Sequence, residues 1–497
     1  MELMPRFIEI CLSLMVFTLP FTLIPNRYRL PVLGGNIPEI FLLLAVIFFL
    51  VYIVYKKHLK VLDDKYFILF FVWSLLCLVW GCWKLPYYDN AVNESLRSSR
   101  MVLIVSHFIP GLMDNVILLH VKMFLSYFWY MIKGFFFPYA GMFFILSWLF
   151  KAGKGKEFKK YLYKGIYGLS ILMVVYSIPE IIWLWTGNET CAWILSCINK
   201  NLYDPVLYNE WWPPLLWKGQ LRSLCLEPSY FGIIVSFLLP CIAVDTYEKR
   251  KAWKIALIFC LVFMIFMTKA RTATVIYFGE SIVIILLSLI YRYLDWRKVL
   301  FTCVVITVGA FSIYLAGDSL HYQGVSTSEL ADKYVKENIT SVVGKDKRSN
   351  SARFGNTTAL IKIGLDYPVT GVGMGLHSPY MEDRIPEFAQ DNYEVKNWIK
   401  DMHEKTFLKS GLPILNEYAA LFAWEGLPGV LFFLFPLLNL MKRIIIQRRK
   451  KINFGKVGLL SALVGQLACM LSSEMFLTYP LILWISYCIF GDRENYE

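Results

Sequence analysis

The sequence predicts an all-α, polytopic membrane helix bundle, and three observations lead to this fold class. First, 57% of the 497 residues are hydrophobic and 17% aromatic, whereas only 18% are charged; soluble domains carry roughly 25% charged residues. Second, long apolar runs recur along the whole chain, and a hydrocarbon core of about 30 Å requires roughly 20 apolar residues per helix. Third, the runs lack the alternation of a membrane β-barrel, so we expect helices that satisfy their own backbone hydrogen bonds.

Twelve apolar segments have the length expected of membrane-crossing helices, which gives about 12 transmembrane helices. The first contains Glu9 and Pro20 and has no small-residue cleavage site before Asn26, so we expect a retained helix rather than a cleaved signal peptide. A further apolar segment, 101–119, is expected to be re-entrant or interfacial, because another crossing there would move the lysine-rich loop 151–164 to the opposite side. The twelve segments are 7–24, 38–55, 66–83, 129–150, 165–186, 229–244, 255–268, 272–291, 299–316, 416–440, 457–472 and 477–490.

The orientation follows from the short loops that are dense in Lys and Arg, because such loops stay on the cytoplasmic side. Their spacing agrees with both termini being cytoplasmic. The formal net charge of +13 is then explained mainly by these anchoring loops, so we do not interpret it as nucleic-acid binding. The basic loops are 56–65, 151–164, 248–254, 292–298 and 442–456.

The chain is expected to divide into three regions. Residues 1–316 hold transmembrane helices 1–9 with the external loop 187–228, residues 317–415 form a large external loop, and residues 416–497 hold helices 10–12 and a cytoplasmic C-terminus. A structureless loop of about a hundred residues is uncommon. Apolar residues at helical spacing in 329–343 and 357–365, followed by the helix-breaking "YPVTGVGMG" (367–375), predict that the large loop is a helical extracytoplasmic cap.

Cysteines and histidines give no indication of a metal site. There is no C-x-x-C or H-E-x-x-H, and the six histidines lack ligand spacing. Cys191, Cys197 and Cys225 are expected outside, where an oxidising compartment permits one disulfide, with Cys191 and Cys197 the nearest pair. We therefore expect neither a metal nor a cofactor.

Cations on the outer face are the most informative feature of the sequence. Arg222 precedes the sixth helix, Lys269 and Arg271 lie in a short turn between helices seven and eight, and Arg353 precedes an expected cap helix. One explanation is that each cation anchors a helix end or binds a lipid headgroup. Together they would also suit a pyrophosphate, because guanidinium groups bind phosphate oxygens bidentately and stay charged.

Four segments in this region resemble the O-antigen ligase and polymerase superfamily. "SARFGNTTALIKIGLDYPVTGVGMG" (351–375) resembles its periplasmic-loop pattern of an arginine, a helix, a proline and Gly-x-Gly-x-Gly. "TKARTAT" (268–274) is similar to its Ser-Arg turn, "RSLCLEPSYFG" (222–232) to its Arg and Glu-Pro-Ser segment, and "NEYAALFAWEGLPG" (416–429) to its entry into the helix after the large loop. The segments occur in the family's order and with its topology.

The resemblance implies metal-independent glycan transfer at the periplasmic face of the bacterial inner (cytoplasmic) membrane. The donor would be a glycan on undecaprenyl pyrophosphate, and fixed cations would stabilise the charge that builds on the leaving pyrophosphate. In ligases a histidine commonly precedes the Asn that Asn416 matches, and this chain has Leu415 there. We therefore expect a polymerase that transfers the growing polysaccharide of an O-antigen, capsule or exopolysaccharide onto the next lipid-linked repeat unit. The expected partners are this donor, membrane lipids, and a chain-length regulator and flippase of the same pathway.

The resemblance also implies roles for individual residues. Arg271 and Arg353 are expected to clamp the pyrophosphate, with Lys269 nearby. Arg222 is expected to hold phosphate or to pair with Glu227. Glu227 is a candidate general base, although Glu-Pro-Ser also suits the start of a helix through its acid and its proline.

Further candidates lie in the cap and after it. His403 and His377 could act as base only if the loop folded back. The glycines could let a sugar or phosphate approach the backbone or could simply form a turn. The candidate substrate contacts in this group are Gly371, Gly373, Gly375, His377, Asn416 and Tyr418.

Other functions remain open on the sequence alone. An O-antigen ligase would pass the glycan to a lipid A core or another acceptor. A lipid-linked oligosaccharide flippase or exporter would need a polar pathway through the bundle, and few charges are placed deeply. A non-catalytic membrane receptor or scaffold would not need the outer-face arginines.

Overall fold

The protein is a bundle of membrane-spanning helices with a helical cap, as the sequence predicts. The computed structural model describes residues 3–29, 34–56, 65–84, 107, 116–203, 213–249, 251–291, 295–321, 326–338, 348–405, 410–446 and 454–491. Eight of the described helices are long and apolar enough to cross a membrane, and three shorter apolar helices accompany them. The predicted segment 101–119 lies mostly outside the described residues.

Each of the twelve predicted segments contains a helix, although several boundaries differ. The helix predicted over 7–24 ends at Phe17, because Pro20 disfavours a helical conformation in the residue before it. The helix predicted to begin at residue 129 is continuous with α6, and a π-helical turn joins α6 to α7. The helices in the membrane region are α1 (Leu3–Phe17), α2 (Ile37–Lys56), α3 (Lys65–Lys84), α6 (Val116–Tyr130), the π-turn η3 (Met131–Phe136), α7 (Phe137–Lys151), α8 (Gly155–Thr186), α10 (Pro228–Glu248), α11 (Ala252–Met267), α12 (Arg271–Tyr291), α13 (Trp296–His321), α19 (Glu417–Ile446), α20 (Phe454–Cys469) and α21 (Thr478–Gly491).

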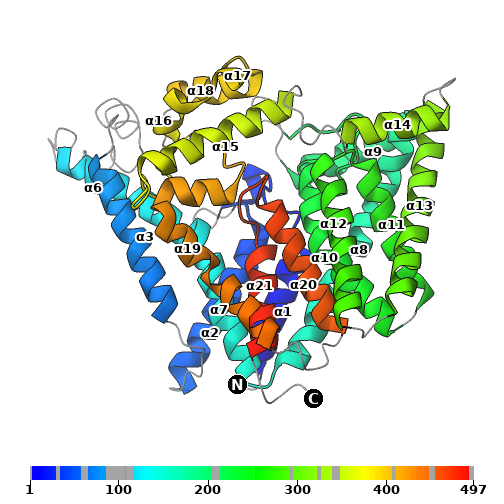
Figure 1. Ribbon diagram of the computed structural model, residues 1–497, viewed down its shortest axis with the longest axis horizontal. Coiled ribbons are helices and arrows are strands. Elements are labelled where there is room, and N and C mark those ends of the chain that lie inside the picture. Colours follow the sequence, from blue (N-terminus) through cyan, green and yellow to red (C-terminus); the bar gives the residue numbers. More distant parts are fainter. Residues whose placement is uncertain are drawn as a thin grey trace.

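The centre of the bundle is formed by α10, α12 and α20, which pack against one another (Figure 1). Two glycines of α20 allow this close approach. A Cβ at Gly458 would lie 2.1 Å from Val244 of α10, and one at Gly465 would lie 1.7 Å from the Glu280 carboxylate of α12. Small residues serve this purpose in membrane helices, where packing and not the hydrophobic effect holds helices together.

Helix α19 is broken in its upper part at Gly426, whose backbone has φ 66° and ψ −166°. The break leaves carbonyl groups without helical partners, and such groups must be satisfied inside a membrane. Segment 367–373 supplies the donors, since Val372 N donates to Ala423 O at 2.9 Å and Gly373 N donates to Trp424 O at 2.8 Å. The cap is therefore joined to a membrane helix by backbone hydrogen bonds.

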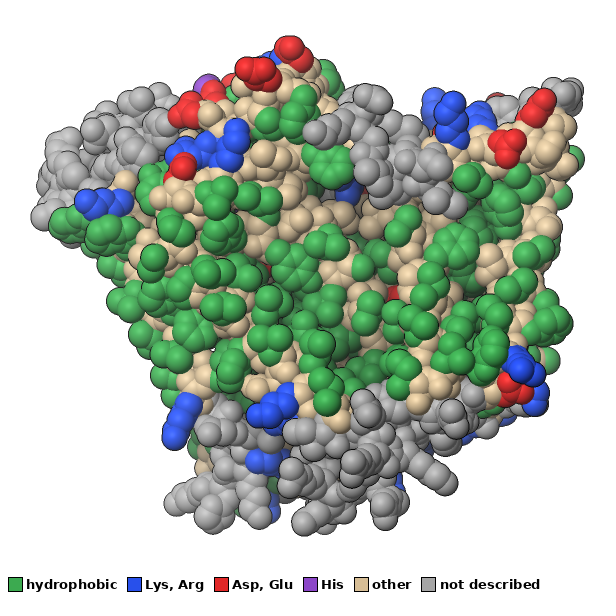
Figure 2. Space-filling view, viewed as in Figure 1, with side chains coloured by type: hydrophobic (Ala, Val, Ile, Leu, Met, Phe, Trp, Pro, Cys, Tyr) green, Lys and Arg blue, Asp and Glu red, His purple; other side chains and the backbone are tan. Residues whose placement is uncertain are grey.

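The cap lies at one end of the bundle, and the predicted basic loops connect helices at the other end (Figure 1). Helix α14 packs on α12 and α13, whereas α15 packs along α19. The described face carries a broad apolar band between two ends where charged side chains gather (Figure 2). The elements on the cap side are α9 (Glu189–Leu202), α14 (Thr327–Asn338), α15 (Arg348–Asp366), α16 (Ser378–Met381), the 3-10 turn η6 (Glu382–Arg384), α17 (Glu387–Gln390) and α18 (Tyr393–Lys405), and a 3-10 turn η1 (Asn26–Tyr28) follows α1.

Candidate functional site

Two arginines from distant parts of the sequence meet where the cap joins the bundle. Arg271 is the first residue of α12, and Arg353 lies in the second turn of α15. Arg353 was predicted to precede its helix, but the helix already begins at Arg348. The two guanidinium groups are close enough for the positive charge of Arg353 to act on Arg271. Two like charges at such range favour an anion between or beside them.

Arg353 keeps most of its donors available. Its Nη1 donates to the carbonyl of Ser472 at 3.1 Å, in the turn between α20 and α21. Among the residues that the structure describes, Arg353 makes no other hydrogen bond or ion pair. Since a guanidinium carries five N–H donors, the group is oriented by one protein contact and can still bind phosphate oxygens bidentately.

The turn before α12 holds Arg271 in place. Lys269 has a left-handed backbone (φ 48°), and the Thr268 hydroxyl accepts a hydrogen bond from Ala270 N at 3.1 Å. The Lys269 ammonium lies 3.3 Å from both carboxylate oxygens of Asp318 on α13. The predicted substrate-binding lysine is therefore paired with a carboxylate of the protein, and this pair fixes the turn that presents Arg271.

The start of α19 is bonded to the turn 470–475, which contains Ser472, the partner of Arg353. The Asn416 Oδ1 accepts from Ala419 N at 3.0 Å and so caps α19, while its Nδ2 donates to Leu471 O at 3.1 Å. Glu417 accepts from Met475 N at 3.0 Å. The Tyr418 hydroxyl donates to Leu467 O at 3.0 Å. Asn416 and Glu417 thus hold the turn that orients Arg353, whereas Tyr418 fastens α19 to α20.

The three glycines of the cap segment all adopt positive φ, at 57° for Gly371, 91° for Gly373 and 84° for Gly375. The chain that approaches them is the protein's own. A Cβ at Gly371 would lie 2.3 Å from the Trp424 carbonyl carbon, and one at Gly375 would lie 2.8 Å from the Tyr127 ring. Of the two roles considered for these glycines, the structure supports a turn packed against α6 and α19.

The two candidate histidines occupy different environments. His377 is buried, its Nδ1 accepts from Trp424 Nε1 at 2.9 Å, and its Nε2 lies 3.3 Å from Leu412 O. Because Nδ1 accepts, Nε2 carries the proton and donates. Burial lowers the pKa of His377 to about 4, so the imidazole is neutral at neutral pH. Both of its ring nitrogens are already used in the two hydrogen bonds within the protein. His403 on α18 is exposed and lies 2.8 Å from Glu382.

Arg222 is almost completely buried, with 1% of its surface exposed. Its guanidinium donates to Pro214 O and Leu215 O at 2.7 Å each and to the Tyr203 hydroxyl. The expected pairing with Glu227 is not what the structure shows, since a carboxylate oxygen of Glu227 accepts from the Ser229 hydroxyl instead. Arg222 therefore orders the external loop.

Glu227 and the residues after it begin a helix, as one of the two interpretations of Glu-Pro-Ser predicted. Pro228 is the first residue of α10 and Glu227 is its N-cap. A carboxylate there is favoured by the helix dipole.

All eleven cysteines lie in the described part of the chain and are free thiols. The disulfide between Cys191 and Cys197 that an oxidising compartment permits is therefore not formed. Both lie on α9, and a spacing of six residues turns them to different faces of one helix.

Three features of the site were missed in the sequence. The Ser472 carbonyl and the Met475 amide are backbone groups, which leave no mark in composition. Asp318 was counted as part of the large loop, yet it belongs to α13, which continues to His321. The signal that could have found it is the continuation of helical spacing past residue 316.

A positive, partly solvent-exposed site between cap and bundle is suited to binding an anion. The family model described as O-antigen ligase matches residues 256–434, from α11 into α19, and so includes both arginines. No curated protein matches the chain. Members of the matched family are membrane glycosyltransferase-like enzymes, and with the apolar helices the match indicates a bacterial inner membrane protein. The match over residues 256–434 supports the family predicted from the sequence, the O-antigen ligase and polymerase superfamily.

Proposed function

We propose that the protein is a polymerase of lipid-linked polysaccharide repeat units of an O-antigen, capsule or exopolysaccharide. It transfers the growing glycan from undecaprenyl pyrophosphate to the next repeat unit at the periplasmic face. The observation that carries the proposal is the pair of guanidinium groups of Arg271 and Arg353, brought together by α12 and α15. A pyrophosphate at the end of a membrane-embedded lipid suits a cationic site at this boundary.

The reaction needs little from the protein except positioning and charge. An acceptor hydroxyl attacks the anomeric carbon of the donor glycan, the bond between that carbon and the phosphate oxygen breaks, and the pyrophosphate leaves with the electron pair. The hydroxyl proton passes to solvent or to a phosphate oxygen. Fixed cations stabilise the negative charge that grows on the leaving group without having to reorganise, so we expect transfer without a metal ion.

Two observations favour a polymerase over a ligase that passes the glycan to a lipid A core or another acceptor. Leu415 stands where ligases commonly carry a histidine. Of the two cap histidines, His377 is buried with both nitrogens occupied, and His403 of α18 is bound to Glu382 of η6. His377 therefore has no nitrogen left to accept the proton of an acceptor hydroxyl, and this finding together with Leu415 argues against a ligase.

The proposed orientation places the cap in the periplasm and both termini in the cytoplasm. It is supported by the basic loops, which connect helices at the end opposite the cap (Figure 1). A flippase or exporter would instead need a charged pathway through the bundle, and the pair of arginines lies at the cap end.

The test is a membrane preparation supplied with lipid-linked repeat units as the only glycan. A ladder of increasing chain length supports the polymerase. Product that forms only after a lipid A core or another distinct acceptor is added would show that the protein is a ligase. A deletion strain that displays no repeat units at all, instead of single repeat units, would indicate a flippase.

A further inference from the structure

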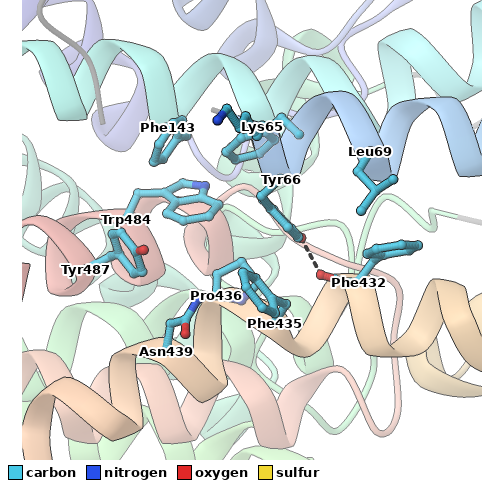
Figure 3. A pocket seen from close by; sticks show the side chains of 11 residues that line it. Lys65, Tyr66, Leu69, Phe143, Phe432, Phe435, Pro436, Asn439, Trp484 and Tyr487 are labelled. Atoms are coloured by element: carbon cyan, nitrogen blue, oxygen red, sulfur yellow. Dashed lines mark hydrogen bonds between the residues drawn. The ribbon is translucent and has the colours of Figure 1, made fainter. Parts of the chain in front are cut away.

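A cavity of about 410 Å³ lies at the other end of the bundle, far from the arginine pair, between α3, α7, α19 and α21 (Figure 3). Its size falls within the range of small-molecule sites, about 300–1,000 Å³. The residues that line it are Lys65, Tyr66, Phe67, Leu69, Phe143, Phe432, Phe435, Pro436, Asn439, Trp484 and Tyr487.

A proline in α19 lines the cavity and changes the hydrogen bonding beside it. Pro436 has no N–H, so the carbonyl of Phe432, four residues earlier, loses its helical donor. The Tyr66 hydroxyl of α3 donates to this carbonyl instead (Figure 3). Tyr66 is therefore held against α19, and its ring forms part of the cavity lining.

The cavity opens toward the hydrocarbon of the membrane. Leu69 and Phe435, both in its lining, are 56% and 46% exposed. Both belong to membrane-crossing helices, so the exposed surface faces lipid and not water. An apolar chain of the bilayer is the molecule that meets this opening.

Cations lie beside this apolar space. Lys65, the first residue of α3, is part of the lining. Arg443 of α19 lies over the Tyr487 ring, with 4.0 Å between its Cζ and the ring centroid, and donates to the Tyr487 hydroxyl at 3.0 Å. Both stand at the helix ends where headgroups are found, so a phosphate group there would be complementary in charge.

One uncharged polar group distinguishes the ligand further. Asn439 lines the cavity, and its amide makes no hydrogen bond with any residue that the structure describes. A primary amide without a partner at membrane depth is costly. The carbonyl of a carboxylic ester in a glycerolipid could accept its N–H, whereas a polyprenyl phosphate is a phosphate ester and has no such carbonyl.

We propose that this cavity, framed by Lys65, Asn439 and Tyr487, is a binding site for one anionic glycerophospholipid. An acyl chain occupies the aromatic space, the ester carbonyl accepts from Asn439, and the phosphate lies near Lys65 and Arg443. Because the chain leaves one apolar medium for another, burial gives little preference by itself. Selectivity comes from the headgroup, at about 1 kcal/mol per cation near an anionic lipid, which is about fivefold.

The test uses the full-length protein purified from vesicles that mix phosphatidylglycerol and phosphatidylcholine, with retained lipids counted by mass spectrometry. We expect retention of phosphatidylglycerol over phosphatidylcholine, lowered about fivefold by Lys65→Gln. Lys84→Gln, at the other end of α3, should leave the ratio unchanged. Asn439→Leu removes the proposed donor to the ester carbonyl, so it should weaken retention of both phosphatidylglycerol and phosphatidylcholine.

Several results would overturn the site. Equal ratios in the wild type and in Lys65→Gln would show that the charge at Lys65 selects nothing. Displacement of phosphatidylglycerol by an equimolar polyprenyl phosphate would show that the occupant is the wrong class of lipid. Leu69→Trp, which fills the cavity, should abolish specific retention, and undiminished retention in a variant with wild-type thermal stability would place the lipid elsewhere.

Discussion

Replacing Arg353 by alanine is the sharpest test of the proposed active site. The side chain makes one described hydrogen bond, to the Ser472 carbonyl, so its loss removes little from the folded structure. A hydrogen bond that involves a charged group contributes about 1.5–3 kcal/mol to stability, which is less than the typical stability of a folded protein, about 5–15 kcal/mol. Losing one donor that stabilises transition-state charge typically lowers the rate about 10²–10³-fold. We therefore expect Arg353→Ala to remain inserted at normal abundance but to lose nearly all polymer formation.

Arg271→Ala should give a loss of similar size, and the double variant shows whether the two groups act together. If both clamp one pyrophosphate, the double variant should lose less than the product of the two single losses, because groups that act as a unit are not additive. Arg353→Lys and Arg271→Lys retain the charge but not the planar fork, so each should recover only part of the rate.

Arg384 of η6 provides the matched control. Its replacement by alanine removes the same charge from the same cap. Arg384 lies outside the site, where its guanidinium is paired with Asp366 at 2.7 Å. A partly exposed ion pair contributes about 0–1 kcal/mol, so Arg384→Ala should retain most activity. The assay is the length distribution of glycans formed from lipid-linked repeat units, normalised to protein abundance. Full-length polymer at the wild-type rate in both Arg353→Ala and Arg271→Ala would refute the clamp.

Four further outcomes are expected. In a protein with Cys197 replaced, an external thiol reagent should label a cysteine at Val335 and not one at Lys156; the reverse pattern would invert the proposed orientation. His403→Ala and His377→Ala should each keep most polymer formation per folded molecule, and loss of transfer in either would reveal a base of the ligase type. Burial lowers the pKa of His377 to about 4, so as the pH falls the unfolded chain takes up the proton on this histidine before the folded protein does. Lowering the pH from 7 to 5 should therefore cost about 2 kcal/mol of stability. The loss should appear as a fall in Tm, and His377→Asn should make this fall smaller. A divalent-cation chelator should leave polymer formation intact, and dependence on added metal would contradict the proposed chemistry.

The sequence was sufficient for the membrane helices because their length and composition are imposed by the bilayer. It was less informative wherever tertiary contacts decide a role. Arg222 and Arg353 carry the same charge on the same expected face, yet one is buried among the carbonyls of Pro214 and Leu215 and the other makes one described contact. Nothing in the local sequence of either residue distinguishes these environments.

The glycine segment illustrates the same limit. Three glycines in five residues predicted a turn, and all three adopt positive φ in it. The structure needs this turn because α19 breaks at Gly426, and the carbonyls of Ala423 and Trp424, which lose their helical donors there, accept from the amides of Val372 and Gly373. A requirement shared by two distant segments cannot be derived from either one alone.

Helix α19 connects the proposed active site with the proposed lipid site. Its first residue, Glu417, binds the turn that orients Arg353, and Pro436 in its lower half lines the aromatic cavity. Between them, the break at Gly426 separates the two halves, and hydrogen bonds from the cap hold the upper half. Because separate elements fix each half, a lipid bound below need not change the arginine pair above. The two proposals can therefore fail independently: Lys65→Gln should change lipid retention without affecting polymer formation, and Arg353→Ala should do the opposite.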